Sequence, residues 1–331
     1  MLEFSIAFVT AGVVMVPVVA LLRRHQVVDV PNLRSSHAVV IPRGGGLGLL
    51  AGVVAGVLAA LLVEPAGSAA LPGAATAVVG SGVALFAGLG LVDDLRRLGA
   101  ARRLLAQAAI AAGISVTIAT GTSSSWDAPL VAVVGALWLV SYVNAFNFMD
   151  GIDAISAVSA LLAACWFGGL ATHDSEPLVY AASWALAGAS LAFLPWNAPR
   201  ARVFLGDVGS YGVGALIAVL ALLTVLRQHD LWWGLAPLVI YLVDTSGTLA
   251  RRAVRHEPLL EAHRSHVYQR LLDHGLSHVS ATAVVLLAGV LICLATLVLP
   301  TLGAVLVAAV VSAAYLALPG LLGRRSPEVA A

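Results

Sequence analysis

Eleven apolar stretches of 17 to 21 residues, almost free of charged side chains, constrain the fold of this 331-residue chain more than any other feature. A helix needs about 20 mostly apolar residues to cross the hydrocarbon core of a bilayer. Asp244, near the end of residues 231–249, is the one charged residue inside these stretches. We therefore predict an all-α, polytopic membrane protein with about 11 transmembrane helices. The expected spans are 4–22, 45–63, 74–92, 104–120, 129–146, 154–172, 178–194, 208–226, 231–249, 279–299 and 301–319.

The composition predicts one membrane domain over residues 1–331 and excludes several other classes of protein. The residues AVILMFWYC make up 60% of the chain and charged residues 11%, against about a quarter charged residues in soluble domains. This balance excludes a soluble globular domain, a disordered chain and a nucleic-acid-binding protein. The first apolar stretch lacks a basic leading region and an A-x-A cleavage site, which indicates a permanent span rather than a signal peptide.

The distribution of positive charge predicts how the chain is oriented in the membrane. All eighteen cationic side chains are Arg, and seventeen of them lie on one set of alternate connections, with Arg227 alone on the other side. Cytoplasmic loops carry the excess of positive charge in membrane proteins. We therefore expect an external N-terminus, a cytoplasmic C-terminus and a cytoplasmic Arg-rich face.

The same connections hold most of the polar residues suited to chemistry. They contain an Asp–Asp pair, an Asn-x-x-Asn repeat and glycine-rich turns, whereas a merely solvated face would show mixed acidic and basic residues. We predict an active site built from these cytoplasmic connections, which cover residues 27–48, 93–103, 144–153, 196–210 and 251–278.

Asp93 and Asp94 form an acidic pair at the end of a span, where two interpretations are open. The pair either caps a helix at the membrane interface or binds Mg²⁺ for phosphate chemistry. Mg²⁺ is usually held by one or two carboxylates together with substrate phosphates. Asp207 in the FLGDVGS segment offers another carboxylate, and the flanking Gly206 and Gly209 would let backbone N–H groups approach a phosphate.

The segment NAFNFMDGID places Asn144, Asn147, Asp150 and Asp153 at every third position. On a straight α-helix each step of three residues falls about 60° short of a full turn, so the first and last of them would point in opposite directions. Either only two neighbours share a site, or the helix breaks near residues 149–151. Irregular backbone at membrane depth is tolerated where it lines a cavity or is buried in protein.

Two further motifs indicate an anionic ligand. Arg43 adjoins the glycine turn at residues 42–46, and His263 and His266 lie three residues apart beside further arginines. Zinc would need a third ligand of matching geometry, so phosphate binding fits the histidines better than a metal does. Carboxylates, arginines and backbone donors together suit a metal–diphosphate ligand, and a site at a membrane surface suits a lipid substrate.

At these motifs the chain resembles the polyprenyl-phosphate N-acetylhexosamine-1-phosphate transferase family. That family includes the phospho-MurNAc-pentapeptide translocase and the GlcNAc-1-phosphate transferases that begin O-antigen and related glycans. The resemblance covers almost the whole chain through five motifs in order. They are PNLRSSH…PRGGG, GLVDD, NAFNFMDGID, N-x-P-x6-GDVGS and EAHRSHVYQRL.

The resemblance implies transfer of N-acetylhexosamine 1-phosphate from a UDP-sugar to undecaprenyl or another polyprenyl phosphate. UMP would leave, and the lipid-diphosphate-linked sugar would initiate a cell-envelope glycan. It also implies Mg²⁺, with Mn²⁺ as a substitute, a location in the bacterial inner membrane, and a homodimer. Arg97 and the sequence EAHRSH depart from the translocase pattern, which has Lys and three consecutive histidines there. This favours the O-antigen branch over the MurNAc-pentapeptide translocase.

The site residues implied by the resemblance fall into three groups. Catalytic roles are expected for Asp93, Asp94, Asp150, Asp153 and Asp207. Metal ligation is expected for Asp93, Asp94, Asn147 and Asp207. Substrate binding is expected for Arg34, Ser36, His37, Arg43, Asn144, Asn147, Asn197, Phe204, Gly206, His263, Arg264 and His266, with Phe204 and Asn197 near uracil and ribose.

We expect Asp93 and Asp94 to position Mg²⁺ and the lipid phosphate rather than to act mainly as a base. A phosphate monoester has a second pKa of about 6, so the acceptor is already largely dianionic at neutral pH.

Two other functions fit the sequence less well than sugar-phosphate transfer. A transporter or flippase places ionisable residues in mid-membrane and often shows inverted repeats, and neither feature is visible here. A CDP-alcohol phosphotransferase carries D-G-x-x-A-R, but Asp150 and Gly151 are followed by a different sequence.

Overall fold

The computed structural model confirms an all-α membrane architecture and describes residues 1–31, 39–63, 73–96, 98–121, 126–173, 176–259, 261 and 263–322. Arg34, Ser36, His37 and Arg97 lie outside these residues. The long helices are α1 (Leu2–Arg24), α2 (Gly46–Val63), α3 (Gly73–Arg96), α4 (Ala100–Gly121), α5 (Ala128–Met149), α6 (Ile155–Leu170), α7 (Pro177–Asn197), α8 (Gly206–Gln228), α10 (Val239–Val254), α12 (His278–Val298) and α13 (Thr301–Leu321). The short elements are α9 (Leu231–Leu235), a 3-10 turn η1 (Ala236–Leu238), α11 (Val267–Asp273), and strands β1 (Val28–Asp29) and β2 (Ile41–Pro42).

Within the described ranges, nine helices are long and apolar enough to cross a membrane, namely α1 to α5, α7, α8, α12 and α13. The apolar helix α6 is shorter, with 16 residues. The prediction of one continuous span over 231–249 is wrong, because this stretch is divided into α9, η1 and α10. Pro237 lies at the division, where its missing N–H is tolerated at the beginning of a helix but not inside one. The orientation of the chain in the membrane stays a prediction.

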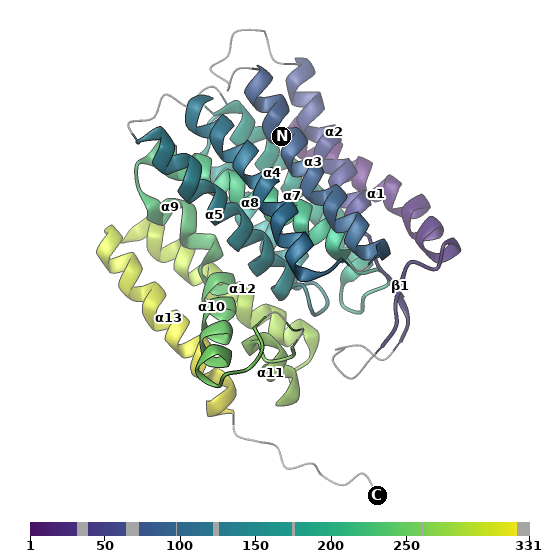
Figure 1. The fold of residues 1–331 in the computed structure, drawn as a ribbon, viewed down its shortest axis with the longest axis vertical. Coiled ribbons are helices and arrows are strands. Elements are labelled where there is room, and N and C mark those ends of the chain that lie inside the picture. Colours follow the sequence, from purple (N-terminus) through teal and green to yellow (C-terminus); the bar gives the residue numbers. More distant parts are fainter. Residues whose placement is uncertain are drawn as a thin grey trace, which may run out of the picture.

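Helix α8 lies at the centre of the bundle (Figure 1), in contact with α2, α3, α5, α6, α7 and α9. Of its most apolar window, 89% is buried inside the protein, against 22% for α13. Helices α12 and α13 form the expected hairpin around Pro300 and pack beside α10 and α6. The central position of α8 fixes its N-terminal residues against the ends of the helices around it.

Candidate active site

The N-terminus of α8 is capped by a carboxylate from another helix. Asp94, near the end of α3, accepts hydrogen bonds from the backbone N–H groups of Asp207 at 3.0 Å and Val208 at 2.9 Å. Its side chain is fully buried and forms an ion pair with Arg43, with 2.9 Å between Nε and Oδ1. A carboxylate at a helix N-terminus satisfies otherwise unpaired N–H groups and interacts favourably with the helix dipole. The geometry therefore favours the cap interpretation for Asp94, which holds Asp207 in place.

The two glycine motifs pack against each other at this cap. Gly44 and Gly45 donate their N–H groups to the carbonyl of Phe204, at 3.1 and 2.8 Å. Gly206 has a φ of +77°, and a Cβ there would lie 2.7 Å from the backbone nitrogen of Gly44. The expectation that the N–H groups around Gly206 approach a phosphate is wrong for Asp207 and for the residue after it, because those groups bind Asp94 instead.

Asp207 and Asn147 lie side by side where α8 begins and α5 ends. Asn147 Nδ2 donates to Asp207 Oδ1 at 2.9 Å and to Ser210 Oγ at 2.8 Å. Helix α5 ends at Met149, which confirms one of the two alternatives for the repeat of polar residues, a break near residues 149–151. The break brings Asp150 to the end of α5, half-buried and close enough to feel the charge of Asp207.

Asp150 lies in surroundings that disfavour its charged form. Burial raises the pKa of Asp150 to about 7, and the carboxylates of Asp207 and Asp94 add to this rise while Arg43 opposes it. Several carboxylates that cannot all stay ionised at low cost are a typical setting for a divalent cation, which compensates their charge.

Asp207, Asp150 and Asn147 carry side-chain oxygens of the kind that suits Mg²⁺. All three are hard oxygen donors, which this ion prefers. Within the described residues, no group of three or more His, Cys, Asp or Glu side chains could enclose a metal ion. Because Mg²⁺ commonly takes its remaining ligands from substrate phosphates and water, an open set of this kind suits it better than a closed protein cage.

Asp93 has a different role from Asp94, the residue that follows it in sequence. It is buried and accepts hydrogen bonds from the Leu98 N–H at 2.7 Å, Arg103 Nη1 at 3.0 Å and the Tyr211 hydroxyl at 3.1 Å. These contacts favour a positioning role for Asp93 over metal ligation. They also hold Arg103 in place. From the sequence, Arg103 was expected only as part of the Arg-rich face.

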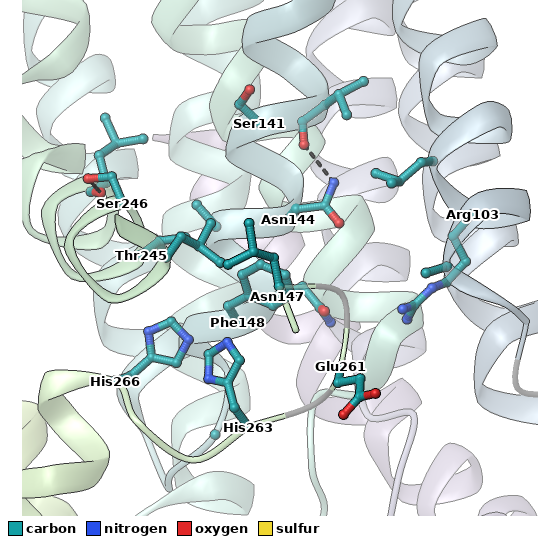
Figure 2. A pocket seen from close by; sticks show the side chains of 18 of the residues that line it. Arg103, Ser141, Asn144, Asn147, Phe148, Thr245, Ser246, Glu261, His263 and His266 are labelled. Carbon is teal, nitrogen blue, oxygen red and sulfur yellow. Dashed lines mark hydrogen bonds between the residues drawn. The ribbon is translucent and has the colours of Figure 1, made fainter. Parts of the chain in front are cut away.

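Beside this cluster lies a cavity of about 750 Å³ between α4, α5, α10 and the segment around α11. Figure 2 shows Arg103, Asn144 and Asn147 on its walls, together with His263 and His266. Its apolar lining comes from Leu104, Val140, Leu242, Leu249 and Leu259. The cavity thus offers both a charged end near the carboxylates and an apolar wall along α10.

The two histidines of the last large connection are placed differently from each other. Burial, followed by the nearby His266 and Arg252, lowers the pKa of His263 to about 4, so His263 is neutral at pH 7. His266 is buried and its Nδ1 lies 3.1 Å from Asp244. Arg264 forms an ion pair with Asp273 at 3.1 Å. This geometry gives no support to a cationic phosphate clamp at His263 and Arg264.

The remaining predicted residues mainly support the backbone around the site. Asn197 is buried, accepts from the N–H of Ala154 at 2.8 Å and donates to the carbonyl of Val203 at 3.0 Å. Asp153 lies 3.1 Å from His278 Nδ1. Asn144 donates to Gln107 Oε1 at 2.6 Å and lines the cavity. The polar repeat therefore serves several partners, and Asn147 and Asp150 are its members nearest to Asp207.

Comparison with known proteins identifies the family of this chain. Residues 76–225 match the family described as Glycosyl transferase family 4. A probable undecaprenyl-phosphate N-acetylglucosaminyl 1-phosphate transferase of Bacillus subtilis (strain 168) is 28% identical over 318 residues, covering 90% of this chain and 86% of the relative. The decaprenyl-phosphate N-acetylglucosaminephosphotransferase of Mycobacterium tuberculosis (strain ATCC 25618 / H37Rv) is 30% identical over 322 residues, covering 83% and 77%.

A phospho-N-acetylmuramoyl-pentapeptide-transferase of Lacticaseibacillus paracasei is 32% identical over 134 residues, covering 40% of each chain. The similarity to the two N-acetylglucosamine enzymes thus covers more of this chain. The chain belongs to glycosyl transferase family 4, among the polyprenyl-phosphate N-acetylhexosamine-1-phosphate transferases.

Proposed function

We propose that this protein transfers N-acetylhexosamine 1-phosphate from a UDP-sugar to a polyprenyl phosphate such as undecaprenyl phosphate. The observation that carries the proposal is the contact between Asp207 and Asn147, near Asp150, beside a cavity whose lining includes Asn147 and Arg103. The names of the relatives support a polyprenyl-phosphate acceptor and favour N-acetylglucosamine as the sugar. A pentapeptide-bearing donor fits less well, because the similarity to two pentapeptide transferases covers 40% and 53% of the chain.

In this reaction an oxygen of the lipid phosphate attacks the phosphorus that carries the sugar. The bond from that phosphorus to the oxygen bridging it to the uridine phosphate breaks, and UMP leaves with the bridging oxygen. The acceptor needs little help from a base, because a phosphate monoester has a second pKa of about 6. Positioning and charge stabilisation therefore supply most of the catalysis.

We propose that Asp207, Asp150 and Asn147 hold Mg²⁺, with Mn²⁺ as a substitute. When bound, the ion would offset the negative charge shared by these carboxylates and the diphosphate. Arg103 would bind a phosphate oxygen from the cavity wall, since its side chain is 31% exposed while Asp93 holds it in one orientation. The cavity volume of about 750 Å³ is in the range of small-molecule sites and suits a sugar nucleotide.

The membrane setting places this chemistry beside the lipid acceptor. The proposed location is the bacterial inner membrane, with the site on its cytoplasmic face because the Arg-rich connections lie there by the positive-inside rule. The glycan that the product initiates, and a homodimeric state, stay predictions from the family resemblance.

The direct test is UMP release by the purified protein in lipid nanodiscs. The panel comprises UDP-N-acetylglucosamine, UDP-N-acetylgalactosamine and UDP-MurNAc-pentapeptide, each with undecaprenyl phosphate and Mg²⁺. We expect UMP from an N-acetylhexosamine donor only when the lipid phosphate is present, and almost none from Asp207→Asn. Release that does not depend on the lipid phosphate, or no release from any donor, would overturn the proposal.

A further inference from the structure

Asp244, the one charged residue in its apolar stretch, is the centre of a buried hydrogen-bond network that the proposed reaction does not use. The N–H groups of Val267 and Tyr268 donate to its two oxygens at 2.9 and 3.3 Å. His266 Nδ1 lies 3.1 Å from Oδ1, and the hydroxyl of Tyr315 donates to Oδ2 at 2.6 Å. Asp244 itself is fully buried. It therefore joins α10, the beginning of α11 and the last helix α13.

This network decides which nitrogen of His266 carries a proton. An ionised carboxylate accepts hydrogen bonds and cannot donate them, so Nδ1 of His266 must carry the hydrogen that points to Asp244. The hydrogen bonds of His266 to Gln269 and Asp244 use its backbone N–H and its Nδ1, and its ring lines the cavity. Nε2 is therefore the atom of His266 that is left for a ligand.

Tyr315 contributes to this arrangement from outside the cavity. It is 3% exposed, and it does not belong to the residues that line the cavity. Its hydroxyl occupies the carboxylate oxygen that does not bind His266, which limits how Asp244 can rotate. A contact on α13 can therefore influence the cavity through Asp244.

The position of His266 is also fixed relative to the proposed metal site. The hydroxyl of Tyr268 donates to the carbonyl of Phe148 at 3.0 Å, at the end of α5 between Asn147 and Asp150. The rings of Phe148 and His266 lie 6.1 Å apart (centroid to centroid), and both residues line the cavity in Figure 2. The network thus holds the histidine at a defined place beside the carboxylate end of the cavity.

We propose that Asp244 and Tyr315 are positioning residues that hold His266 as the neutral Nδ1–H tautomer. Nε2 then accepts a hydrogen bond from a hydroxyl or amide N–H of the sugar nucleotide. The role of the ligand rests on the proposed function of the cavity, whereas the tautomer does not. Since the neutral ring has an acceptor at Nε2, it selects a donor group on the substrate and not a phosphate oxygen.

The tautomer is tested by nuclear magnetic resonance of protein labelled with [15N]histidine, in nanodiscs at pH 8 without substrate. The signals of His266 are identified by their loss in His266→Gln. We expect a protonated Nδ1 and an unprotonated Nε2 in the wild type, and loss of this preference in Asp244→Asn. A wild-type ring protonated at Nε2, alone or together with Nδ1, would overturn the proposal.

The effect on the substrate is tested by a double-mutant cycle between Tyr315→Phe and His266→Gln. We expect Tyr315→Phe to raise the KM for UDP-N-acetylglucosamine up to about tenfold with little change in kcat, the size of one hydrogen bond. In the His266→Gln background the same change should have no further effect, because it acts through that ring. Multiplied effects of the two changes would contradict the positioning role.

Tyr241→Phe is the matched control for the cycle. Tyr241 is also buried, and its hydroxyl donates to the carbonyl of Ile155 at 3.1 Å, away from His266. Its effects should combine independently with those of His266→Gln. If the wild type releases no UMP, the proposed function fails, and the resonance experiment alone decides whether the carboxylate positions the histidine.

Discussion

Helices α8 and α11 both begin at a buried aspartate supplied by another helix, but the two aspartates have different further partners. Asp94 caps α8 and is paired with Arg43, which is 27% exposed. Asp244 caps α11 and is completed by His266 and Tyr315, which are both buried. A charged partner at the first cap offsets the repulsion between two neighbouring carboxylates. At the second cap the side-chain partners that the structure describes include an imidazole and a phenolic hydroxyl, and the contact sets the orientation of a ring.

The same kind of contact, a carboxylate that accepts hydrogen bonds from the N–H groups of a helix N-terminus, serves two purposes in this protein. The α8 cap fixes a carboxylate, Asp207, at the proposed metal site. The α11 cap fixes an imidazole on the cavity wall. A helix as short as α11, with seven residues, is not stable by itself, so the cap also determines that it forms there.

The largest expected effect concerns the residue that the α8 cap presents. Asp207→Asn removes a charge from the proposed metal site and should lower turnover by about 10²–10³-fold, as loss of a preorganised electrostatic contact does. Asp127→Asn is the matched control, because Asp127 caps α5 by accepting from the N–H of Leu130, a role that Asn fills equally well. The rate of UMP release measures the effect. Equal rates for Asp207→Asn and the wild type would show that Asp207 has no role in the reaction.

The next largest effect is expected on the free energy of unfolding when a capping aspartate is replaced. Asp94→Asn should lower the free energy of unfolding by about 2 kcal/mol, since hydrogen bonds to a charged group are lost. Much of this loss arises because Asp94→Asn leaves Arg43 without its ion-pair partner. Adding Arg43→Gln to Asp94→Asn should therefore restore part of the lost stability. Among the residues that the structure describes, Asp244 forms no ion pair with an arginine, so no comparable second change is expected to rescue Asp244→Asn. Thermal unfolding in one detergent measures both, and full additivity of Asp94→Asn and Arg43→Gln would contradict the paired cap.

A smaller effect is expected at Arg103, which Asp93 holds toward the cavity. Arg103→Lys keeps the charge but loses the planar fork that can bind Asp93 and a phosphate together. We expect the KM for the UDP-sugar to rise about tenfold, as for the loss of one charge-assisted hydrogen bond. Arg227→Lys is the control and should leave KM unchanged, because Arg227 lies in the last turn of α8, at the end away from Asp207. An equal rise in both variants would exclude a contact between Arg103 and the substrate.

The smallest expected effect is a pH dependence of stability at His263. Its pKa of about 4 in the folded protein lies below the value of about 6.5 for an unfolded chain. Between these values the unfolded state binds more protons, so stability falls as the pH drops from 6.5 toward 4. Melting temperatures at pH 7.5 and pH 5.5 should differ less in His263→Gln than in the wild type. An identical pH dependence in both would mean that His263 is not shielded from water.

Much of the fold follows from the local sequence. Apolar stretches long enough to span a bilayer predicted most of the helices, and Gly151 and Pro300 marked the break after α5 and the final hairpin. The exception, residues 231–249, has the length and hydropathy of a span. Its interruption at Pro237 depends on how α9 and α10 pack against their neighbours.

The candidate site was predicted less completely because its contacts join distant parts of the chain. Asp93 and Asp94 are adjacent in sequence, yet one holds Arg103 and the other caps α8, 113 residues away. Asp244 was visible as an isolated charge, but its partner Tyr315 lies 71 residues away. A single sequence shows which residue types gather in the same connections. It does not show which carboxylate faces a helix end and which faces a cavity.

The most direct test of this account is Mn²⁺ binding, followed by electron paramagnetic resonance, in the presence of UDP-N-acetylglucosamine. The central claim is that the proposed metal site at the α5–α8 junction and the histidine wall beside α11 lie at different places beside one cavity. The account predicts that Asp207→Asn weakens Mn²⁺ binding at least about tenfold, as loss of one carboxylate ligand should. Asp244→Asn should leave Mn²⁺ binding unchanged. Equal loss in both variants, or loss in Asp244→Asn alone, would contradict it.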